Sequence, residues 1–271
     1  MKYHLLNAGR SLGLLPMLDR VALLRGRARA AASNRAFRRA NPGFALPPQD
    51  LAFDAYHKVD WRDYHDGGRA HAALFARIMG ERTPGDRPLQ VLEWGCGPGR
   101  LIRHMQALLG DRAGGIIGTD YNPATIAWCQ ANLPGIDFAL NGLAPPLPFA
   151  DDSFDAIYSF SVFTHLSEAM HHAWIAELQR VLRPGGLLIA TTHGDRHRYL
   201  LTGRAEAEAY ARGEFVAQSG FEEGKKYYFA FHPPAWVRGT LLAGLEGVER
   251  IDPGPDAGLI QDIWVGHKRH G

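Results

Sequence analysis

Val-Leu-Glu-Trp-Gly-Cys-Gly-Pro-Gly-Arg, residues 91–100, runs from an apolar segment into three glycines at alternate positions. The apolar start predicts a buried strand, and the sequence after Arg100 predicts a helix. Glycines at such a turn let the backbone approach a ligand closely, because they lack a Cβ atom and accept positive φ at little cost. The turn also directs the free N–H groups of the next helix toward a bound molecule. This decapeptide therefore predicts a ligand site at a strand-to-helix turn.

The glycine spacing separates two kinds of ligand. A dinucleotide fingerprint, Gly-x-Gly-x-x-Gly, would place its third glycine at position 100. Here Gly99 comes one residue earlier, and Arg100 follows it. Glu93 stands two residues before Gly95, where its carboxylate would repel a pyrophosphate and attract a cation. The loop therefore favours a positively charged ligand.

The decapeptide resembles the first motif of the class I S-adenosylmethionine-dependent methyltransferases, in which two apolar residues and an acid precede Gly-x-Gly-x-Gly. The resemblance implies a Rossmann-like α/β fold, with a seven-stranded, mostly parallel sheet, an antiparallel last strand and helices on both faces. It implies S-adenosylmethionine as cofactor and S-adenosylhomocysteine as product, with Glu93 holding the cofactor's amino group. The other residues expected to line the methionine part are Gly95, Cys96, Gly97, Gly99 and Arg100. The alternative is an ordinary glycine turn after a strand.

Later segments support the resemblance. The run 115–120 predicts a second strand ending at Asp120, 21 residues after Gly99, near the spacing at which an acid meets ribose hydroxyls. Tyr121 is expected to flank the adenine ring, and Asn122-Pro123 predicts a capped helix start. A third strand over 138–143 ends where the family places a polar residue against the adenine amino group. The residues expected there are Asn141, Gly142 and Leu143.

The fourth signal covers residues 154–193. It predicts a strand over 154–160, a helix over 166–182, a turn at Arg183-Pro-Gly-Gly186 and a fifth strand over 187–193. This block resembles the family's later motifs, so the similarity spans about residues 88–194. It places Ser159 and Phe160 in the cofactor site.

Aromatic and polar residues precede the decapeptide, with a helix expected over about 69–79. In related methyltransferases a helix before the first motif closes over the methionine end of the cofactor, so Tyr64 and Arg69 are candidates for that contact. Cation–π attraction to the sulfonium would favour an aromatic residue there. Interior packing is the alternative.

The residues expected to bind the methyl acceptor follow the fourth and fifth predicted strands. His165 and His193 are expected at the carboxyl edge of the sheet, where either could take a proton from an attacking hydroxyl. A structural histidine satisfied by backbone groups is the alternative for each. An insertion over 194–232, with a helix over 203–212 and a hairpin of 214–218 with 225–232, is expected to cover the acceptor. The further candidates beside the two histidines are Thr164, Asp195 and His232.

The end of the chain closes the sheet. A helix is expected from Pro233 to about Leu245, followed by strands over 247–251 and 260–268. Two strands joined only by a loop must run antiparallel, because a parallel pair needs a long crossover. This final pair differs from the arrangement of nicotinamide dehydrogenases.

The basic N-terminus forms a separate region. Residues 1–40 carry nine cationic side chains against Asp19 alone, although the whole 271-residue chain has a net charge of only +2. Residues 1–48 are expected to be a basic amphipathic arm and linker, and residues 49–271 the methyltransferase domain. An apolar stripe on the arm fits either packing on the protein or a subunit partner, or weak contact with an anionic membrane surface. The stripe consists of Leu14, Met17, Leu18, Val21 and Leu24.

The sequence predicts an O-methyltransferase acting on a small-molecule or sugar hydroxyl. N-methylation of an amine, a non-catalytic cofactor-binding subunit and a nicotinamide oxidoreductase are the alternatives. Two cysteines provide neither a disulfide framework nor a metal pattern, so we expect no metal and a cytoplasmic protein, peripheral at the inner membrane face if the arm binds lipid. The near-neutral charge and the absence of an Asn/Asp-Pro-Pro-Tyr loop lower the expectation of a nucleic-acid partner. Self-association is left open.

Overall fold

The computed structural model describes residues 15–201, 203–218, 220–254 and 258–270, and it divides the chain after Gly68 into two compact units. The expected boundary between arm and methyltransferase domain, after Pro48, stays a prediction. Residues 52–64 share a hydrophobic core with Phe37 of the basic helix. Leu14 of the expected apolar stripe lies outside the described residues.

The N-terminal unit is helical and contains α2 (Leu15–Ala40), α3 (Gln49–Tyr56) and the start of α4 (Trp61–Arg82). The side chain of Asn34 connects α2 to the start of α4. Its Nδ2 donates to the Val59 carbonyl at 2.8 Å, and its Oδ1 accepts from the Trp61 N–H at 2.8 Å. Since the first N–H groups of a helix have no intrahelical acceptor, this bond defines where α4 begins. The predicted helix over about 69–79 was therefore too short, and α3 was missed.

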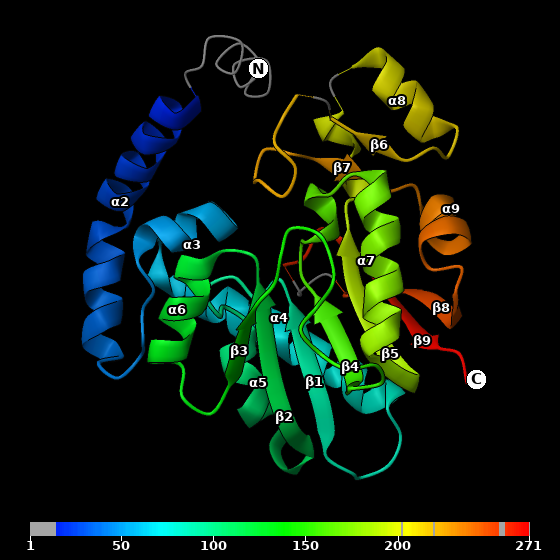
Figure 1. The fold of residues 1–271 in the computed structure, drawn as a ribbon. Coiled ribbons are helices and arrows are strands. Elements are labelled where there is room, and N and C mark those ends of the chain that lie inside the picture. The colour runs from blue at the N-terminus through cyan, green and yellow to red at the C-terminus, as the bar shows by residue number, and fades with distance from the viewer. Residues whose placement is uncertain (1–14, 202, 219, 255–257, 271) are drawn as a thin grey trace. The chain divides into compact units, whose positions relative to one another are not determined.

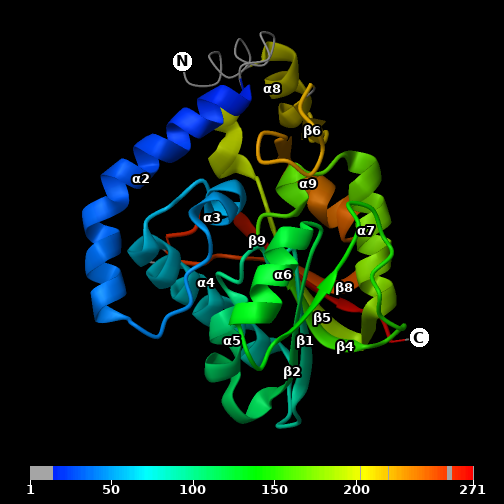
Figure 2. The ribbon, with the colours of Figure 1, turned by 60° about the vertical axis from the view of Figure 1, so that its left-hand side comes forward.

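The second unit is built on a seven-stranded sheet in the order β3-β2-β1-β4-β5-β9-β8 (Figures 1 and 2). β9 runs antiparallel to both β5 and β8, and the remaining neighbours are parallel. The predicted fold class is confirmed. The strands are β1 (Leu89–Trp94), β2 (Ala113–Asp120), β3 (Asp137–Leu140), β4 (Phe154–Ser159), β5 (Leu182–Thr192), β8 (Leu245–Ile251) and β9 (Asp262–Lys268).

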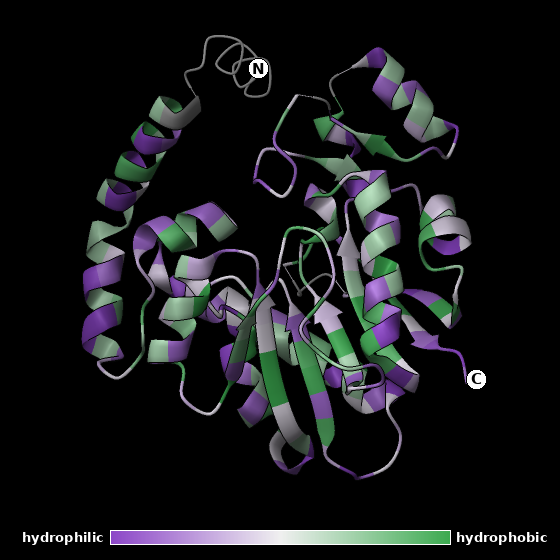
Figure 3. Ribbon diagram, viewed as in Figure 1, coloured by the Kyte–Doolittle hydropathy of each residue, from purple (hydrophilic) through white to green (hydrophobic). Residues whose placement is uncertain are grey.

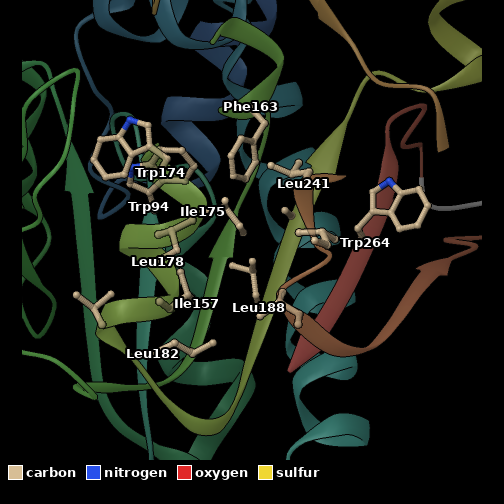
Figure 4. Packing of buried hydrophobic residues seen from close by; sticks show 14 of the residues in the cluster. Trp94, Ile157, Phe163, Trp174, Ile175, Leu178, Leu182, Leu188, Leu241 and Trp264 are labelled. Atoms are coloured by element: carbon tan, nitrogen blue, oxygen red, sulfur yellow. The ribbon is translucent and has the colours of Figure 1, made fainter. Parts of the chain in front are cut away.

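Helices cover both faces of this sheet, because side chains alternate along each strand. Ile157 belongs to a large apolar cluster with Trp174 and Leu178 of α7 (Glu168–Val181), as Figure 4 shows. The next residue, Tyr158, faces the other way and contacts Phe75 of α4, with ring centroids 5.5 Å apart. The strands that carry the site are thus buried from both sides.

Two further helices follow β1 and β2, namely α5 (Ile102–Leu109) and α6 (Pro123–Asn132). The predicted start of α6 is confirmed, since the Asn122 side chain accepts from the N–H groups of Ala124 and Thr125. Asn122 stands directly after Asp120 and Tyr121, so the cap also fixes the chain where β2 ends.

Several predicted boundaries were wrong. β3 ends at Leu140, so residues 141–143 lie beyond the strand. β5 begins at Leu182, which pairs with Phe154, so the expected turn at residues 183–186 is part of the strand. The helix expected up to about Leu245 is reduced to α9 (Pro234–Trp236) and the π-helical turn η4 (Val237–Leu241), because Leu245 already pairs with Lys268.

The insertion after β5 contains η3 (Asp195–Leu200), α8 (Arg204–Ala211), β6 (Val216–Ala217) and β7 (Ala230–Phe231). β6 and β7 form a separate antiparallel pair, as expected, although the pairing covers only two residues on each strand. Among the described residues, no helix is long and apolar enough to cross a membrane.

Candidate functional site

The glycine loop is bound to the end of β2. The N–H groups of Gly95 and Cys96 both donate to the Thr119 carbonyl at 2.8 Å. Gly95, Gly97 and Gly99 have φ angles of +78°, +49° and +73°, which side-chain-bearing residues rarely adopt. The three glycines therefore provide a backbone conformation, and the two N–H bonds hold that conformation against the next strand.

Two of these glycines also allow close packing. A Cβ on Gly95 would overlap the Val162 side chain, and a Cβ on Gly99 would overlap Leu133. Val162 lies between β4 and the short helix η2 (Phe163–His165), so Gly95 lets the loops after β1 and β4 meet. The thiol of Cys96 is buried, and burial raises its pKa, which keeps it protonated.

Glu93 lies on β1 with only 2% of its surface exposed, and its Oε2 accepts a hydrogen bond from the Tyr158 hydroxyl at 2.7 Å. Burial raises the pKa of Glu93 to about 8, although the Tyr158 bond and the positive charge of Arg100 act in the opposite direction. A cationic group placed beside this carboxyl would favour its ionised form. The predicted partner of the cofactor's amino group is thus a buried carboxyl that a bound cation would ionise.

Asp120, the last residue of β2, connects the glycine loop to the start of α6. Its Oδ2 accepts from the Gly97 N–H at 2.9 Å, and its Oδ1 accepts from the Asn122 N–H at 2.8 Å. Each carboxylate oxygen can accept a further hydrogen bond. Asp120 is thus oriented by the backbone and suited to the ribose hydroxyls that the sequence predicted for it.

Asn141 follows β3, and its backbone N–H donates to the Asp120 carbonyl at 3.1 Å. Its side-chain Nδ2 donates to the Gly142 carbonyl at 2.6 Å, whereas its buried Oδ1 finds no hydrogen-bond donor among the described residues. A buried acceptor without a donor is costly. The adenine amino group is a donor of the kind that this atom lacks, and contact between the two stays a prediction.

The insertion contacts Tyr121 and Leu143, the two residues that were expected near the adenine ring. The Tyr121 hydroxyl donates to the Gly224 carbonyl at 3.1 Å, and the Lys225 ammonium lies 5.2 Å from the centre of its ring. A Cβ on Gly224 would overlap the Leu143 side chain. Residues 224 and 225 of the insertion thus lie against the predicted adenine side of the site.

Arg100 and Phe160 form a stack with a residue that sequence reasoning missed. The Arg100 guanidinium lies 5.0 Å from the centre of the Phe160 ring, and its Nη2 is 3.2 Å from Nδ1 of His71 on α4. His71 stacks on Phe160 at 4.9 Å. The position of the Arg100 side chain is therefore fixed by Phe160 and His71 as well as by the glycine loop. Neighbouring Ser159 is fully buried, and its hydroxyl has no hydrogen-bond partner among the described residues.

Tyr64 and Arg69, the two candidates that precede the glycine loop, lie in different surroundings. Tyr64 belongs to the core of the N-terminal unit, where its ring meets those of Trp61 and Tyr56 at 5.9 Å. Arg69, at the start of the second unit, is exposed. Tyr64 thus has the packing role that was its alternative, and cofactor contact by either residue stays a prediction.

His165 and His193 both bond to the segment that leads into and includes β7. Nδ1 of His165 lies 2.8 Å from the Tyr228 carbonyl, and Nδ1 of His193 lies 3.2 Å from the Ala230 carbonyl. A carbonyl only accepts, so each Nδ1 must carry the proton and each neutral ring has a lone pair on Nε2. Burial lowers the pKa of both histidines. The two predicted histidines are thus neutral rings bonded to one segment of the insertion.

The loop that carries His165 is held by residues that sequence reasoning did not single out. Ser161 adopts a positive φ of 62°, and its N–H donates to Thr191 Oγ1 at 2.8 Å. Gln261 Nε2 donates to the Ser161 hydroxyl at 2.8 Å, and the Thr164 hydroxyl donates to the Ser161 carbonyl at 2.9 Å. Thr164 therefore positions the loop. Strain at Ser161 is the kind of feature that marks functional loops, but φ is not readable from sequence.

His232 pairs with His171 on α7, with 2.8 Å between the two Nε2 atoms. Nδ1 of His171 donates to the Ser167 carbonyl at 2.7 Å, so its Nε2 must accept and His232 must donate. Burial lowers the pKa of His171 to about 4 and also lowers the pKa of His232 well below its ordinary value. Asp195 instead accepts from the Tyr210 hydroxyl at 3.1 Å. In the described part of the chain, no three His, Cys, Asp or Glu side chains are grouped to hold a metal ion.

Comparison with known proteins agrees with this geometry. Residues 91–186 match the family model of a methyltransferase domain. A probable S-adenosylmethionine-dependent methyltransferase of Mycolicibacterium smegmatis is 36% identical over 124 residues, 46% of this chain and 44% of that protein. A probable phthiotriol/phenolphthiotriol dimycocerosates methyltransferase 2 of Mycobacterium ulcerans is 34% identical over 147 residues, 52% of this chain and 49% of the relative. The chain thus spans about half the length of the curated relatives it matches.

A solved structure extends the similarity to the fold. The crystal structure of Streptomyces venezuelae DesVI is similar with a TM-score of 0.55 at 18% identity, covering 83% of this chain and 100% of that one. The matched segment runs from the glycine loop to the start of β5, and the sheet order adds the antiparallel final strand. Residues 91–186 thus match a methyltransferase domain, and the second unit has the fold of DesVI, with the antiparallel final strand.

Proposed function

We propose that the protein transfers a methyl group from S-adenosylmethionine to a hydroxyl group of a small molecule, such as a sugar or another natural product. The observation that carries the oxygen acceptor is the pair of bonds from one segment, residues 228–230, to Nδ1 of His165 and His193. Both rings thereby keep an unprotonated Nε2 at the carboxyl edge of the sheet, where ligands bind in open α/β folds.

Three acidic or polar side chains in the second unit would hold the cofactor. Glu93 suits its ammonium group, the two oxygens of Asp120 suit the ribose hydroxyls, and the donor-free Oδ1 of Asn141 suits the adenine amino group. S-adenosylmethionine supplies an electrophilic methyl group on a sulfonium. The chain's own contribution is to position the acceptor and remove its proton, because alignment alone can supply much of the acceleration of such a displacement.

His165 is the proposed base. A hydroxyl must lose its proton as its oxygen attacks, and Nε2 of His165 would receive that proton while Nδ1 stays bonded to Tyr228. The lowered pKa keeps the ring neutral at physiological pH, so it is ready to accept. The names of the Mycobacterium relatives include a triol and a phenol, both of which are hydroxyl compounds. Their names support an oxygen acceptor for this chain as well.

We expect His165→Ala to leave cofactor affinity unchanged and to lower turnover at least about tenfold, because general-base catalysis contributes at this scale or more. Turnover is measured with methyl-labelled cofactor and a panel of hydroxyl and amine acceptors, and affinity by calorimetry. His172→Ala, which removes an exposed histidine of α7, is the matched control and should behave as wild type. Wild-type turnover in His165→Ala on the accepted substrate would exclude His165 as base and favour a neutral amine, which can lose its proton after transfer.

Cofactor binding should release a proton. Glu93, with its pKa of about 8, is mostly protonated at pH 7, whereas a bound ammonium requires the ionised carboxylate. Affinity should therefore rise with pH between pH 6 and about 8. Calorimetry in two buffers with different ionisation enthalpies should give about one proton released per cofactor at pH 7. Glu93→Gln should bind more weakly and release none; equal proton release in this variant would assign the proton to another group.

A further inference from the structure

The outer face of α2 combines exposed apolar side chains with arginines. Met17 and Leu24 are 57% and 55% exposed, and Leu18 and Val21 are 38% and 37% exposed. Successive residues of an α-helix are rotated by about 100°, so residues 17, 21 and 24 fall within about 60° of one another. The apolar half of this face therefore lies in one stripe near the start of the helix.

The helix packs within its own unit through a different face. Ala30, Asn34 and Phe37 are buried, and they lie about 180° around the helix from Val21. Phe37 joins the core of the N-terminal unit, and Asn34 bonds to Val59 and Trp61. The apolar stripe thus points away from the surface that the N-terminal unit uses for its own packing.

Positively charged arginine side chains lie on the same outer face of α2. By the same rotation, the exposed side chains of Arg25, Arg35 and Arg39 lie within about 50° of the direction opposite to the buried face. Within residues 15–40 the helix has seven arginines, and its one acid, Asp19, lies on the buried side. Figure 3 shows hydrophobic and hydrophilic residues alternating along α2. The outer face is therefore apolar toward its start and cationic toward its end, without a carboxylate.

We propose that this outer face of α2 docks on an anionic lipid surface. Exposed Met17, Val21 and Leu24 would enter the boundary between headgroups and acyl chains, while the arginines meet lipid phosphates. An apolar stripe alone would suit any apolar partner. The surplus of arginines on the same face selects a negatively charged surface, because anionic lipids attract such clusters. This docking surface is independent of the methyl acceptor and of the proposed base.

The test is co-sedimentation of the full chain with vesicles. Binding should be at least about tenfold tighter to vesicles that contain phosphatidylglycerol than to pure phosphatidylcholine, and salt should weaken it. Val21→Ser/Leu24→Ser should lower binding at least about fivefold, because it removes buried apolar area. Helix content measured by circular dichroism should stay at the wild-type level in each variant.

Arginine pairs provide a matched comparison. Arg35→Gln/Arg39→Gln removes two charges from the outer face, whereas Arg20→Gln/Arg38→Gln removes two charges from the side of the same helix. Docking through the outer face predicts a clearly larger loss for the first pair. Equal losses would indicate unoriented attraction and overturn the proposal. Concentration-dependent self-association, or a lower melting temperature in Val21→Ser/Leu24→Ser with vesicle binding unchanged, would instead assign the face to a second copy or to the chain itself.

Discussion

Asp120→Ala is expected to weaken S-adenosylmethionine binding at least about 100-fold, which corresponds to about 3 kcal/mol. The substitution removes both acceptor oxygens proposed for the ribose hydroxyls, and hydrogen bonds to a charged group contribute about 1.5–3 kcal/mol each. It also leaves the N–H groups of Gly97 and Asn122 without their carboxylate acceptor. The loss therefore combines missing contacts with a less ordered glycine loop. Calorimetric titration of the purified full chain measures it.

Asp120→Asn is the matched variant. It has the same shape and keeps one acceptor oxygen, so binding should fall less than in Asp120→Ala. The melting temperature of each variant without cofactor separates disorder of the loop from loss of ribose contacts. If Asp120→Ala binds the cofactor within a few-fold of wild type, Asp120 does not hold the ribose.

Lowering the pH is expected to destabilise the second unit at pH values well above those at which its carboxylates become protonated. His171 is buried with a pKa of about 4 in the fold, against an ordinary value of 6.5. The unfolded chain therefore binds a proton that the folded chain rejects, so stability is complete above about pH 6.5 and is lost as the pH falls toward 4. This one group accounts for about 3 kcal/mol. Burial lowers the pKa of His193 and His232 as well and adds to the loss.

Substituting His171 and His232 together tests whether these two histidines cause the loss of stability in acid. His171 lies among the rings of Phe163, Phe215 and Trp236, so the double variant His171→Phe/His232→Phe replaces both hydrogen-bond partners with apolar rings. Its free energy of unfolding, measured with urea at pH 7 and at pH 4.5, should fall clearly less than that of wild type. His172→Phe, at an exposed position next in sequence, should keep the full acid loss. An equal drop in the double variant would assign acid lability to other groups.

The conformation of the glycine loop and of the end of β2 was predictable because its signals are local. Glu93, the glycines and Asp120 occupy fixed places relative to strand ends, and Asn122 caps the next helix within three residues of Asp120. Such short-range constraints are visible in a single sequence. The corrections at residues 141–143 and 182–186 concern where strands end, which depends on partners in neighbouring strands rather than on local pattern.

The acceptor side depends on contacts between distant residues. His165 bonds to Tyr228, 63 residues away, and His171 bonds to His232, 61 residues away. No spacing rule links such positions, so the sequence could nominate the histidines but not their proton positions. The same reason explains His71, whose contact with Arg100 depends on where α4 crosses the sheet. The core that Phe37 shares with Trp61 was not readable from the sequence either, because such packing leaves no periodic signal.

Gly224 has a consequence for engineering. Its carbonyl accepts from Tyr121, its N–H donates to the His165 carbonyl at 2.8 Å, and its Cα stands against Leu143. A single residue without a side chain thus borders the proposed adenine side and the proposed base at once. Exchanging the insertion for a related one would also alter cofactor retention unless a glycine with the same φ of +78° is kept at this position. Transplanted segments should therefore be chosen by their fit at residue 224 before their fit to the new acceptor.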